Sequence, residues 1–578
     1  MVNLTINGIP VQVEAGSTVL EAARKLGIHI PTLCHLKDVN EIGACRMCVV
    51  ESKGSRALQA SCVLPVAEGM EIKTNTPVVR EARKVVLELL LSEHNRRCLT
   101  CVRSLNCELQ SLAEELGVTD IRFDGEADPS DFDDLSPSIV RDNSKCVLCR
   151  RCVSVCRNIQ NIGVIGSQQR GFKTRIGSPF EKPLSEVACI NCGQCIAVCP
   201  VGALSEKDST ERVWQALGDS KKHVIFQTAP AVRVALGEEF GYPIGTRVTG
   251  QMAAAIRRLG ADKVYDTDYA ADLTIMEEGT ELLQRLNEGG KLPMITSCSP
   301  GWIKYCEHNY HEFLDNLSTC KSPHEMFGAV MKSYYAKKSN IDPKDIFVVS
   351  VMPCTAKKFE CERCELANEE GLQDVDAVLT TRELAKMIKQ SGIDFKGLPE
   401  EGFDPVFGDS TGAAVIFGAT GGVMEAALRT VADILTGKDL DDIEYTDVRG
   451  IQGVKEATVD INGMKVNVAV AHGTKSAGAL LDKIKSGEAD YHFIEIMGCP
   501  GGCVAGGGQP IVPARVRLDI DPKVARAKAI YEEDESMTLR KSHKNPSVQK
   551  LYDEFLGEPC GHLSHELLHT HYTARPKY

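Results

Sequence analysis

Three features typical of other protein classes are missing from this sequence of 578 residues. Positive charge is not in excess: the formal net charge is −13, which argues against nucleic acid and anionic membranes as partners. No apolar run reaches the roughly 18 residues of a transmembrane helix, so we expect no membrane span. The N-terminus lacks a basic region followed by an apolar one, so we expect no signal peptide and a cytoplasmic protein.

Cysteine, in contrast, is abundant, with 24 residues. Disulfides are not expected, because the cytosol keeps thiols reduced. Most of these cysteines fall between Cys34 and Cys199, and the rest lie between Cys298 and Cys560. A chain of this length is too long for one core, so we expect three or more domains. The cysteine distribution predicts a metal-rich first third and a larger body with fewer cysteines.

The first domain is expected to begin with a hairpin and a helix. Residues 2–13 alternate polar and apolar around Asn7-Gly8, a hairpin signal. Thr18 and Glu21 have the spacing of a capping box at a helix start. This order is typical of a β-grasp domain. Four cysteines follow with the spacing C-x10-C-x2-C-x13-C, a pattern that suits either an iron–sulfur cluster or zinc: Cys34, Cys45, Cys48 and Cys62.

A second set of ligands follows a helix that we expect over residues 77–92. Its spacing is H-x3-C-x2-C-x5-C, and its members are His94, Cys98, Cys101 and Cys107. One imidazole and three thiolates suit a zinc ion as well as a cluster. The residue types alone leave both possibilities open.

Two further cysteine runs follow an acidic stretch, residues 124–137, that we interpret as a linker. Each has the spacing C-x2-C-x2-C-x3-C; the runs are Cys146, Cys149, Cys152, Cys156 and Cys189, Cys192, Cys195, Cys199. This is the arrangement of two-cluster ferredoxins, in which the fourth cysteine of each run ligates the other run's cluster. We therefore expect Cys199 in the first [4Fe–4S] site and Cys156 in the second. Arg157 stands where proline usually follows the first run.

From about residue 209, apolar β-rich segments alternate with helical patterns. Strands are expected at residues 223–227, 345–351, 375–379 and 492–497. Short apolar runs between helices predict α/β layers with buried strands. The cysteines here follow such runs at Gly/Pro turns, where open α/β sheets usually place a site. We expect two lobes with a cofactor in the cleft between them.

Three segments of this body stand out, at residues 294–302, 351–358 and 493–510. The third places Cys499 and Cys503 in a loop rich in glycine, which lets backbone amides approach a bulky group. Two thiolates there suit iron–sulfur, zinc or copper(I), and alone the loop fits a zinc knuckle or redox dithiol equally well. Together, the three segments resemble the signature segments of [FeFe]-hydrogenases, which hold the hydrogen-evolving H-cluster.

The resemblance covers nearly the whole chain, in the domain order of the large monomeric clostridial type. It implies a β-grasp [2Fe–2S] domain at 1–78, a [4Fe–4S] domain with one histidine and three cysteine ligands at 79–123, a two-[4Fe–4S] ferredoxin domain at 124–208, and a two-lobed α/β H-cluster domain at 209–578. The cofactors implied are one [2Fe–2S] cluster, three accessory [4Fe–4S] clusters and the H-cluster. Similar cysteine patterns occur in the large iron–sulfur subunit of respiratory complex I.

The resemblance also assigns roles around the H-cluster. It implies that Cys354, Cys499 and Cys503 are ligands, with Cys503 bridging the cubane to the two-iron subsite. Lys357 and the backbone at Ala229-Pro230 match groups that bind the cyanides. A cation and aimed amides beside an anionic ligand are what electrostatic preorganisation requires. The matched lining residues are Met352, Pro353, Met497 and Phe417.

Two positions depart from the family pattern. Where the family has a cysteine pair, this chain has Cys298 and Ser299. The first position is the family's proton-donating thiol and the second its fourth cubane ligand. Either Ser299 ligates through oxygen, or Cys298 becomes the ligand and loses the donor role. His324 stands where many members have glutamine.

A proton path is also implied. Glu278, Glu281 and Arg285 lie at i, i+3 and i+7, so they share one helix face. From spacing alone, Glu281 and Arg285 form an ordinary ion pair on a solvated helix. The resemblance instead implies a relay through Glu281, Glu278, Ser318 and Cys298, with Arg285 at its outer mouth.

The resulting hypothesis is a hydrogenase catalysing 2H⁺ + 2e⁻ ⇌ H₂ with ferredoxin as electron partner. The chain is expected to be a monomer that receives its two-iron subsite from maturation proteins. The alternatives are the catalytic subunit of an NADH-linked bifurcating complex, a hydrogen-sensing regulator and a cytosolic iron–sulfur assembly protein. Cys361 and Cys364 could form a small metal or redox pair, although spare thiols are the simpler interpretation.

Overall fold

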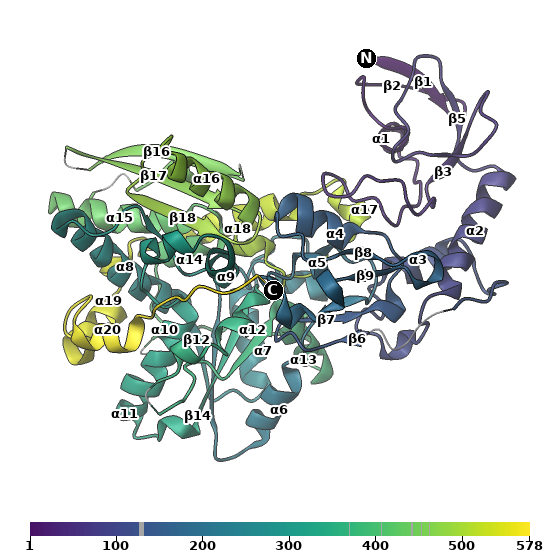
Figure 1. Ribbon diagram of the computed structural model, residues 1–578. Helices are drawn as coiled ribbons and strands as arrows, with labels where there is room; N and C mark the ends of the chain where they lie inside the picture. Colours follow the sequence, from purple (N-terminus) through teal and green to yellow (C-terminus); the bar gives the residue numbers. More distant parts are fainter. Residues whose placement is uncertain are drawn as a thin grey trace.

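The structure is a computed structural model that describes residues 1–126, 132–368, 370–405, 407–440, 443–451, 453–461 and 463–577. A small N-terminal domain projects from a larger body that contains the rest of the chain (Figure 1). Among the described residues, none of the helices is both long and apolar enough to cross a membrane.

The N-terminal domain is a five-stranded sheet with the strand order β2-β1-β5-β3-β4. Its elements are β1 Val2–Ile6, β2 Ile9–Val13, α1 Val19–Lys25, β3 Val49–Ser52, β4 Gln59–Ala60 and β5 Glu71–Lys73. The predicted hairpin is confirmed, since β1 and β2 pair antiparallel around Asn7-Gly8. The capping box is confirmed too: the Thr18 hydroxyl accepts from the Glu21 N–H, and the Glu21 carboxylate accepts from the Thr18 N–H.

Helix α2 (Pro77–Ser92) leads from this domain to the rest of the molecule, as predicted (Figure 1). Pro77 is its first residue, and the Thr76 hydroxyl accepts a hydrogen bond from the Val79 N–H, so proline and cap fix where it begins. The next elements are α3 Glu108–Glu115, β6 Phe132–Asp133, β7 Ile139–Asp142, α4 Arg151–Ser154, β8 Gly166–Gln168, β9 Arg175–Gly177, α5 Gln194–Val198 and β10 Leu204–Glu206. The strands among them form a sheet of order β10-β7-β6 and a separate two-stranded β8-β9 sheet.

The prediction of a linker over residues 124–137 is wrong for the C-terminal end of this segment. Phe132 and Asp133 form β6, which pairs with β7. The Asp133 carboxylate also accepts a hydrogen bond from the Leu184 N–H and contacts Arg141. These partners draw the acidic segment into the ferredoxin-like domain. Residues 127–131 lie outside the described residues.

The body contains a fully parallel sheet of order β12-β11-β14-β15. Its strands are β11 His223–Thr228, β12 Lys263–Asp266, β14 Ile346–Met352 and β15 Ala377–Thr380. Apolar side chains of β11 and β14 are buried and pack with those of the surrounding helices in one core. The buried apolar runs predicted for this lobe are confirmed, with β15 beginning two residues later than expected.

The second lobe is built on a mixed sheet of order β13-β18-β17-β16. Its strands are β13 Met294–Ile295, β16 Val454–Ile461, β17 Met464–His472 and β18 Phe493–Met497. Strand β18 is parallel to both β13 and β17, whereas β16 and β17 form an antiparallel pair. Every residue of β18 is buried, as the sequence predicts for 492–497.

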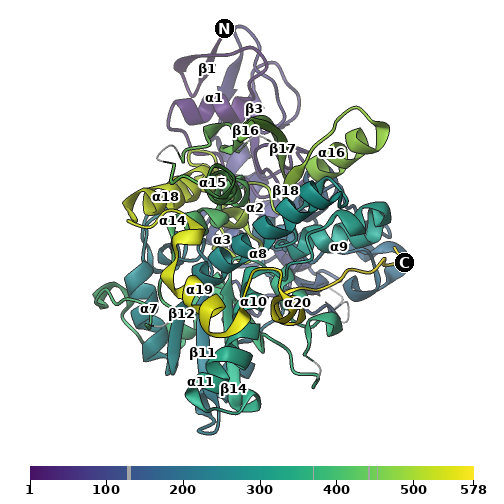
Figure 2. The same cartoon turned by 90° about the vertical axis from the view of Figure 1, so that its left-hand side faces the viewer.

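The helices of the body cover both sheets (Figures 1 and 2). They are α6 Thr210–Gly218, α7 Thr249–Arg258, α8 Asp268–Glu288, α9 Pro300–Asn309, α10 Pro323–Val330, α11 Ala336–Ser339, α12 Ala356–Glu360, α13 Thr381–Gln390, α14 Gly412–Val415, α15 Gly422–Thr436, α16 Thr474–Ser486, α17 Ala514–Arg517, α18 Pro522–Ser536, α19 Pro546–Leu551 and α20 His562–Leu568. After α20 the chain returns along α9, where the Arg575 N–H donates to the Glu307 carbonyl (Figure 2).

Candidate active site

One cavity collects the residues that the three sequence segments singled out. Its empty volume is about 740 Å³. The residues that line it include Ala229, Pro230, Cys298, Ser299, His324, Met352, Pro353, Cys354, Lys357, Phe417, Met497, Cys499 and Cys503. They come from both lobes, so the cavity lies where the lobes meet.

The strand ends explain why these segments converge. Parallel strands present their carboxyl ends at one edge of a sheet. In the first lobe, β11 leads into Ala229 and β14 leads into Cys354. In the second lobe, β13 leads towards Cys298 and β18 leads towards Cys499. The predicted position of the cysteines at strand ends is therefore confirmed.

Three cysteine thiols of the cavity could serve as sulfur ligands for a metal group. Burial raises the pKa of Cys354, Cys499 and Cys503, to about 12 for Cys503. Cys354 also raises the pKa of the other two, which places the thiols close to one another. Half-buried thiols with raised pKa values ionise at neutral pH only when a cationic partner binds. Soft sulfur donors in a largely apolar cavity therefore fit an iron–sulfur group.

Glycines allow the loop that carries Cys503 to pack against its surroundings. Gly502 has a φ of 89°, and a Cβ there would lie 2.6 Å from the Thr420 nitrogen. A Cβ on Gly506 would lie 2.1 Å from the Pro353 carbonyl oxygen. Any side chain at either position would push the loop away from the cavity.

The adjacent residues Cys298 and Ser299 face different neighbours. Ser299 Oγ accepts a hydrogen bond of 2.9 Å from the Gly498 N–H, beside Cys499. Burial raises the pKa of Cys298 well above its usual range, and the carboxyl of Glu278 and the thiol of Cys503 raise it further. The Cys298 thiol is therefore near enough to the Glu278 carboxyl and to Cys503 for their charges to act on it.

Lys357 belongs to a buried charged group at the edge of the cavity. Its Nζ lies 2.7 Å from Glu360 Oε2 and donates to the Cys298 carbonyl at 3.2 Å. Glu360 also lies 2.8 Å from His324 Nε2. Although burial opposes ionisation, Lys357 and His324 lower the pKa of Glu360 to about 2. A fixed cation thus faces the cavity, a suitable partner for an anionic ligand.

The remaining lining is apolar. Ala229, Met352, Phe417 and Met497 are all buried, and Pro353 joins them in the cavity wall. Such walls exclude water and strengthen the electrostatic interactions inside.

A chain of polar side chains runs from Cys298 towards the surface. Arg285 contacts Glu281 at 2.5 Å, and the Ser318 hydroxyl lies 3.0 Å from Glu281 Oε2. Ser318 also hydrogen-bonds Glu278. Burial, with the nearby Glu281 charge, raises the pKa of Glu278 to about 8. Both glutamates are buried, so a solvated surface ion pair does not describe this helix face.

Four cysteines of the N-terminal domain form two close pairs. Cys48 and Cys62 have their Sγ atoms 3.3 Å apart. The Cys34 N–H points at Cys45 Sγ at 3.4 Å, and the Cys45 N–H points at Cys34 Sγ at 3.5 Å. Backbone N–H groups aimed at sulfur stabilise thiolates and fit a cluster with four sulfur ligands.

His94 has the properties of a ligand. Burial lowers the pKa of its imidazole to about 4, so the ring is neutral at pH 7. Its Nδ1 is buried and lacks a hydrogen-bond partner. Cys101 and Cys107 lie close enough for the charge of one thiolate to raise the pKa of the other. An unpaired, buried ring nitrogen in a segment that also carries three thiols fits a histidine-ligated metal group.

Two further cavities lie in the ferredoxin-like domain. One has an empty volume of about 460 Å³ and is lined by Cys146, Cys149, Cys152 and Cys199. The other, of about 450 Å³, is lined by Cys156, Cys189, Cys192 and Cys195. Each run's fourth cysteine thus lies in the cavity of the other run.

The second of these cavities adjoins the active-site cavity. Gln194 Nε2 donates to the Ala505 carbonyl at 2.8 Å, and Thr355 Oγ1 donates to the Asn191 carbonyl at 2.7 Å. Cys192 is also near enough to raise the pKa of Cys499. The ferredoxin-like domain is therefore in direct contact with the loops that carry the active-site cysteines.

Sequence reasoning missed two buried glutamates. Glu360 lies three residues after Lys357, a helical spacing that could have identified it as the partner. Glu495 is the one charged residue in the buried strand β18, and its carboxylate accepts from the Gly421 and Met424 N–H groups at 2.6 and 2.8 Å. A charge inside an apolar strand was the available signal.

The spare cysteines considered as a metal or redox pair face separate partners. Cys361 is buried and its thiol donates to the Lys358 carbonyl. Cys364 is exposed and contacts Glu365.

Profiles of known families match most of the chain. The iron only hydrogenase large subunit, C-terminal domain, matches residues 222–507, and the iron hydrogenase small subunit matches 520–575. A 2Fe-2S iron-sulfur cluster binding domain matches 1–77. The NADH-ubiquinone oxidoreductase-G iron-sulfur binding region matches 83–122, and the NADH-quinone oxidoreductase subunit 3 ferredoxin-like domain matches 136–205.

Individual relatives span the full length. The chain is 50% identical to the NADP-reducing hydrogenase subunit HndD of Solidesulfovibrio fructosivorans, covering 100% of both chains. It is 44% identical to iron hydrogenase 1 of Clostridium pasteurianum over 99% of this chain and 100% of that one. A solved structure of the [FeFe]-hydrogenase HydA1 from Chlamydomonas reinhardtii matches with 43% identity and a TM-score of 0.57, covering 63% of this chain and 99% of that one. The chain therefore belongs to the iron-only, or [FeFe], hydrogenases and is a hydrogenase catalytic chain that carries iron–sulfur domains and an H-cluster domain.

Proposed function

We propose that this chain catalyses 2H⁺ + 2e⁻ ⇌ H₂ with one [2Fe–2S] cluster, three accessory [4Fe–4S] clusters and one H-cluster. The observation that carries the proposal is the single cavity between the lobes, which gathers three thiols, one hydroxyl and one lysine. When bound there, the H-cluster supplies the iron centre at which protons and electrons combine. The domain limits that we propose are 1–78, 79–123, 124–208 and 209–578.

The cavity residues divide into ligands and surroundings. Cys354, Cys499 and Cys503 would hold the cluster, and Ser299 would occupy the fourth ligand position. Lys357 and the backbone at Ala229-Pro230 bind its anionic ligands. The apolar side chains of the wall exclude water: Met352, Pro353, Phe417 and Met497.

Protons move along the buried polar side chains of α8 and its neighbours. Arg285 holds Glu281 at the outer end, Ser318 bridges Glu281 to Glu278, and Cys298 delivers the proton inside. A relay needs groups that both accept and donate a proton within hydrogen-bond reach. Carboxyl, hydroxyl and thiol groups meet that requirement.

Residues of the N-terminal domains would hold the accessory clusters, which supply one-electron carriers when bound. The proposed ligands are Cys34, Cys45, Cys48 and Cys62 for the [2Fe–2S] cluster, and His94, Cys98, Cys101 and Cys107 for the next. The last cluster, held by Cys156 and the first three cysteines of the second run, adjoins the active site. These clusters carry one electron each, and the reaction needs two, so several centres in series suit it.

Two electron partners are candidates. The first is a ferredoxin that donates to a cytoplasmic, monomeric enzyme. The second is a nicotinamide-linked complex in which this chain is one subunit, and it is favoured by the full-length similarity to a subunit of an NADP-reducing hydrogenase. A hydrogen sensor is disfavoured because the Cys298 donor is present and is near enough to Glu278 for that charge to act on it.

The reaction is tested by expressing the chain with and without the maturation proteins that build the two-iron subsite. Only the matured protein should evolve H₂ from a reduced viologen. Reduced ferredoxin alone should then support evolution if the first partner is correct. A requirement for NADH or NADPH and a co-purifying flavoprotein would instead assign the chain to a complex. Equal H₂ evolution without maturation would contradict the proposed cofactor.

A further inference from the structure

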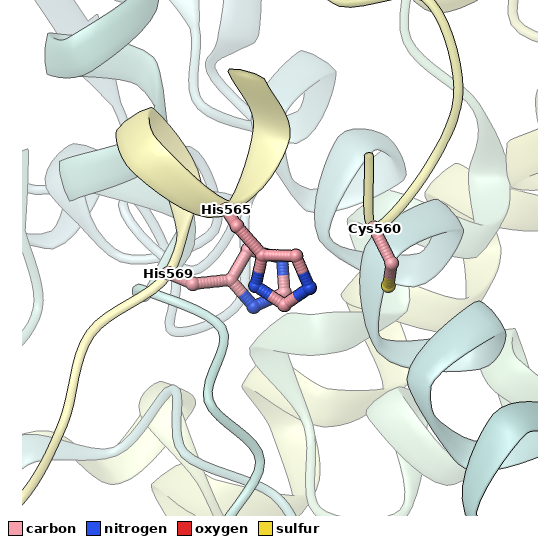
Figure 3. Close-up of side chains that lie close together, drawn as sticks. All are labelled: Cys560, His565 and His569. Atoms are coloured by element: carbon pink, nitrogen blue, oxygen red, sulfur yellow. The ribbon is translucent and has the colours of Figure 1, made fainter. Parts of the chain in front are cut away.

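The C-terminal segment brings together three potential metal ligands outside the active site. Ligand atoms of Cys560, His565 and His569 all lie within 4.8 Å of one another. The two imidazoles are tilted by 40° to each other with ring centroids 4.2 Å apart, and the Cys560 thiol lies across from them (Figure 3). The proposed hydrogenase reaction uses none of the three.

The local backbone explains how the cysteine reaches the histidines. His565 and His569 are four residues apart at the end of α20, so their side chains lie on one face. Cys560 has a φ of 56°, a left-handed conformation that is uncommon for residues other than glycine. Its N–H donates to Glu277 Oε2 at 2.7 Å, which holds this turn against α8.

The buried histidine of the group is already oriented. His569 Nε2 lies 3.1 Å from Glu277 Oε2, and its Nδ1 lies 2.7 Å from Thr319 Oγ1. A metal-binding histidine typically keeps one such partner on one ring nitrogen while the other nitrogen binds the ion, so zinc would replace one of these two hydrogen bonds. His565, in contrast, is exposed, so an ion can reach the group from solvent.

We propose that Cys560, His565 and His569 form a binding site for Zn²⁺. One thiolate and two imidazoles are the ligands that this borderline-soft ion prefers, and three protein ligands leave a fourth position for water. Zinc–ligand bonds are ~2.0–2.3 Å long. The exposed His565 side chain and the half-buried Cys560 side chain can rotate to bring their ligand atoms to that distance from the ion.

The site adjoins the outer end of the proposed proton relay. His569, Glu281 and Cys320 also have ligand atoms within 4.8 Å of one another. The Thr319 N–H donates to Glu281 Oε2 at 3.1 Å, while its hydroxyl contacts His569. A dication bound to His569 attracts the nearby Glu281 carboxylate and holds it in place. Bound zinc therefore slows proton delivery, a consequence that rests on the proposed function.

Zinc binding is tested on the matured enzyme, in which iron already occupies the cluster cysteines. One equivalent of zinc chloride is added, excess metal is removed, and zinc content and the zinc X-ray absorption edge are measured. We expect one zinc per chain, with one sulfur and two nitrogen ligands. Cys560→Ala and His565→Ala should each lower retention at least tenfold, whereas His562→Ala, an exposed histidine of the same helix, should not. Equal retention in all four proteins, or a zinc shell without sulfur, would overturn the site.

The effect on turnover is measured separately as the ratio of H₂ evolution with and without zinc. The parent and His562→Ala should lose at least about tenfold in rate, in line with general acid–base contributions. The ratio for Cys560→Ala and His565→Ala should stay near one. If zinc binds tightly through one sulfur and two nitrogen ligands and the rate of H₂ evolution does not fall, zinc at this site is not an inhibitor. An inactive parent without zinc would contradict the proposed function instead.

Discussion

Ser299 Oγ accepts a 2.9 Å hydrogen bond from the backbone N–H of Gly498, the residue that precedes Cys499. This bond turns the Ser299 side chain towards the loop that carries two of the proposed ligands. The neighbouring Cys298 thiol is near enough to Glu278 for the charge of that carboxyl to raise its pKa. Of the two alternatives that the sequence left open, this geometry favours Cys298 as proton donor and Ser299 at the ligand position.

Replacing Cys298, the proposed proton donor, should lower turnover without preventing assembly of the cubane. Cys298→Ala removes the thiol that faces Glu278 and leaves Cys354, Cys499 and Cys503 in place. Iron content and the spectrum of the cubane should match those of the parent, while H₂ evolution falls at least ~10²-fold. Cys306→Ala, a buried cysteine outside the cavity, serves as the control. Failure of Cys298→Ala to assemble the cubane would make Cys298 the ligand.

Glu281 should be essential for turnover and dispensable for cofactor binding. Glutamine has nearly the shape of glutamate but cannot pass on a proton by ionising. We therefore expect Glu281→Gln to keep the cofactor and to lower H₂ evolution at least ~10²-fold. Glu288→Gln changes an exposed glutamate at the end of the same helix and should have little effect. Similar activity in both variants at equal cofactor loading would remove Glu281 from the relay.

The rate should depend on pH through Glu278. Burial raises the pKa of this carboxyl to about 8, so it carries a proton at pH 7 and loses it as the pH rises through 8. Turnover limited by proton delivery should be nearly constant below pH 8 and should fall above it. The folded protein binds this proton more tightly than the unfolded chain does. The resulting contribution to the free energy of unfolding is complete below about pH 4.5, the ordinary pKa of a glutamate, and is lost as the pH rises to about 8. Rates measured across pH 6–9 at saturating reductant, with no break near pH 8, would contradict this assignment.

The accessory ligand patterns predict the metal content of protein made without maturation. One [2Fe–2S] and three [4Fe–4S] clusters contain about fourteen iron atoms, and the cubane of the active site adds about four more. Iron and sulfide analysis should find that total and no two-iron subsite. Zinc in place of iron would instead support the zinc alternatives for the cysteine patterns.

The elements next to the cysteines could be predicted because local chemistry dictates them. Thr18 with Glu21 caps α1, Pro77 starts α2, and the continuous apolar run of β18 predicts a buried strand. The domain order followed from the resemblance of the chain's segments to those of [FeFe]-hydrogenases. Each of these signals lies within a short stretch of sequence.

The remaining features depend on contacts between distant segments. Phe132 and Asp133 form β6 only because β7 offers a pairing edge, so composition alone suggested a linker. Burial of Glu281 depends on α8 packing against α10 and α15, which spacing within α8 does not reveal. Glu360 and Glu495 likewise gain their roles from Lys357, His324 and the N-terminal turn of α15.

Infrared spectroscopy of the matured protein tests the central claim most directly. If the cavity between the lobes holds the H-cluster, the spectrum should contain cyanide and carbonyl stretching bands. Lys357→Ala should shift or remove the cyanide bands, because Lys357 is the charged lysine that lines the cavity. A matured, iron-loaded protein without any cyanide or carbonyl band would contradict the account.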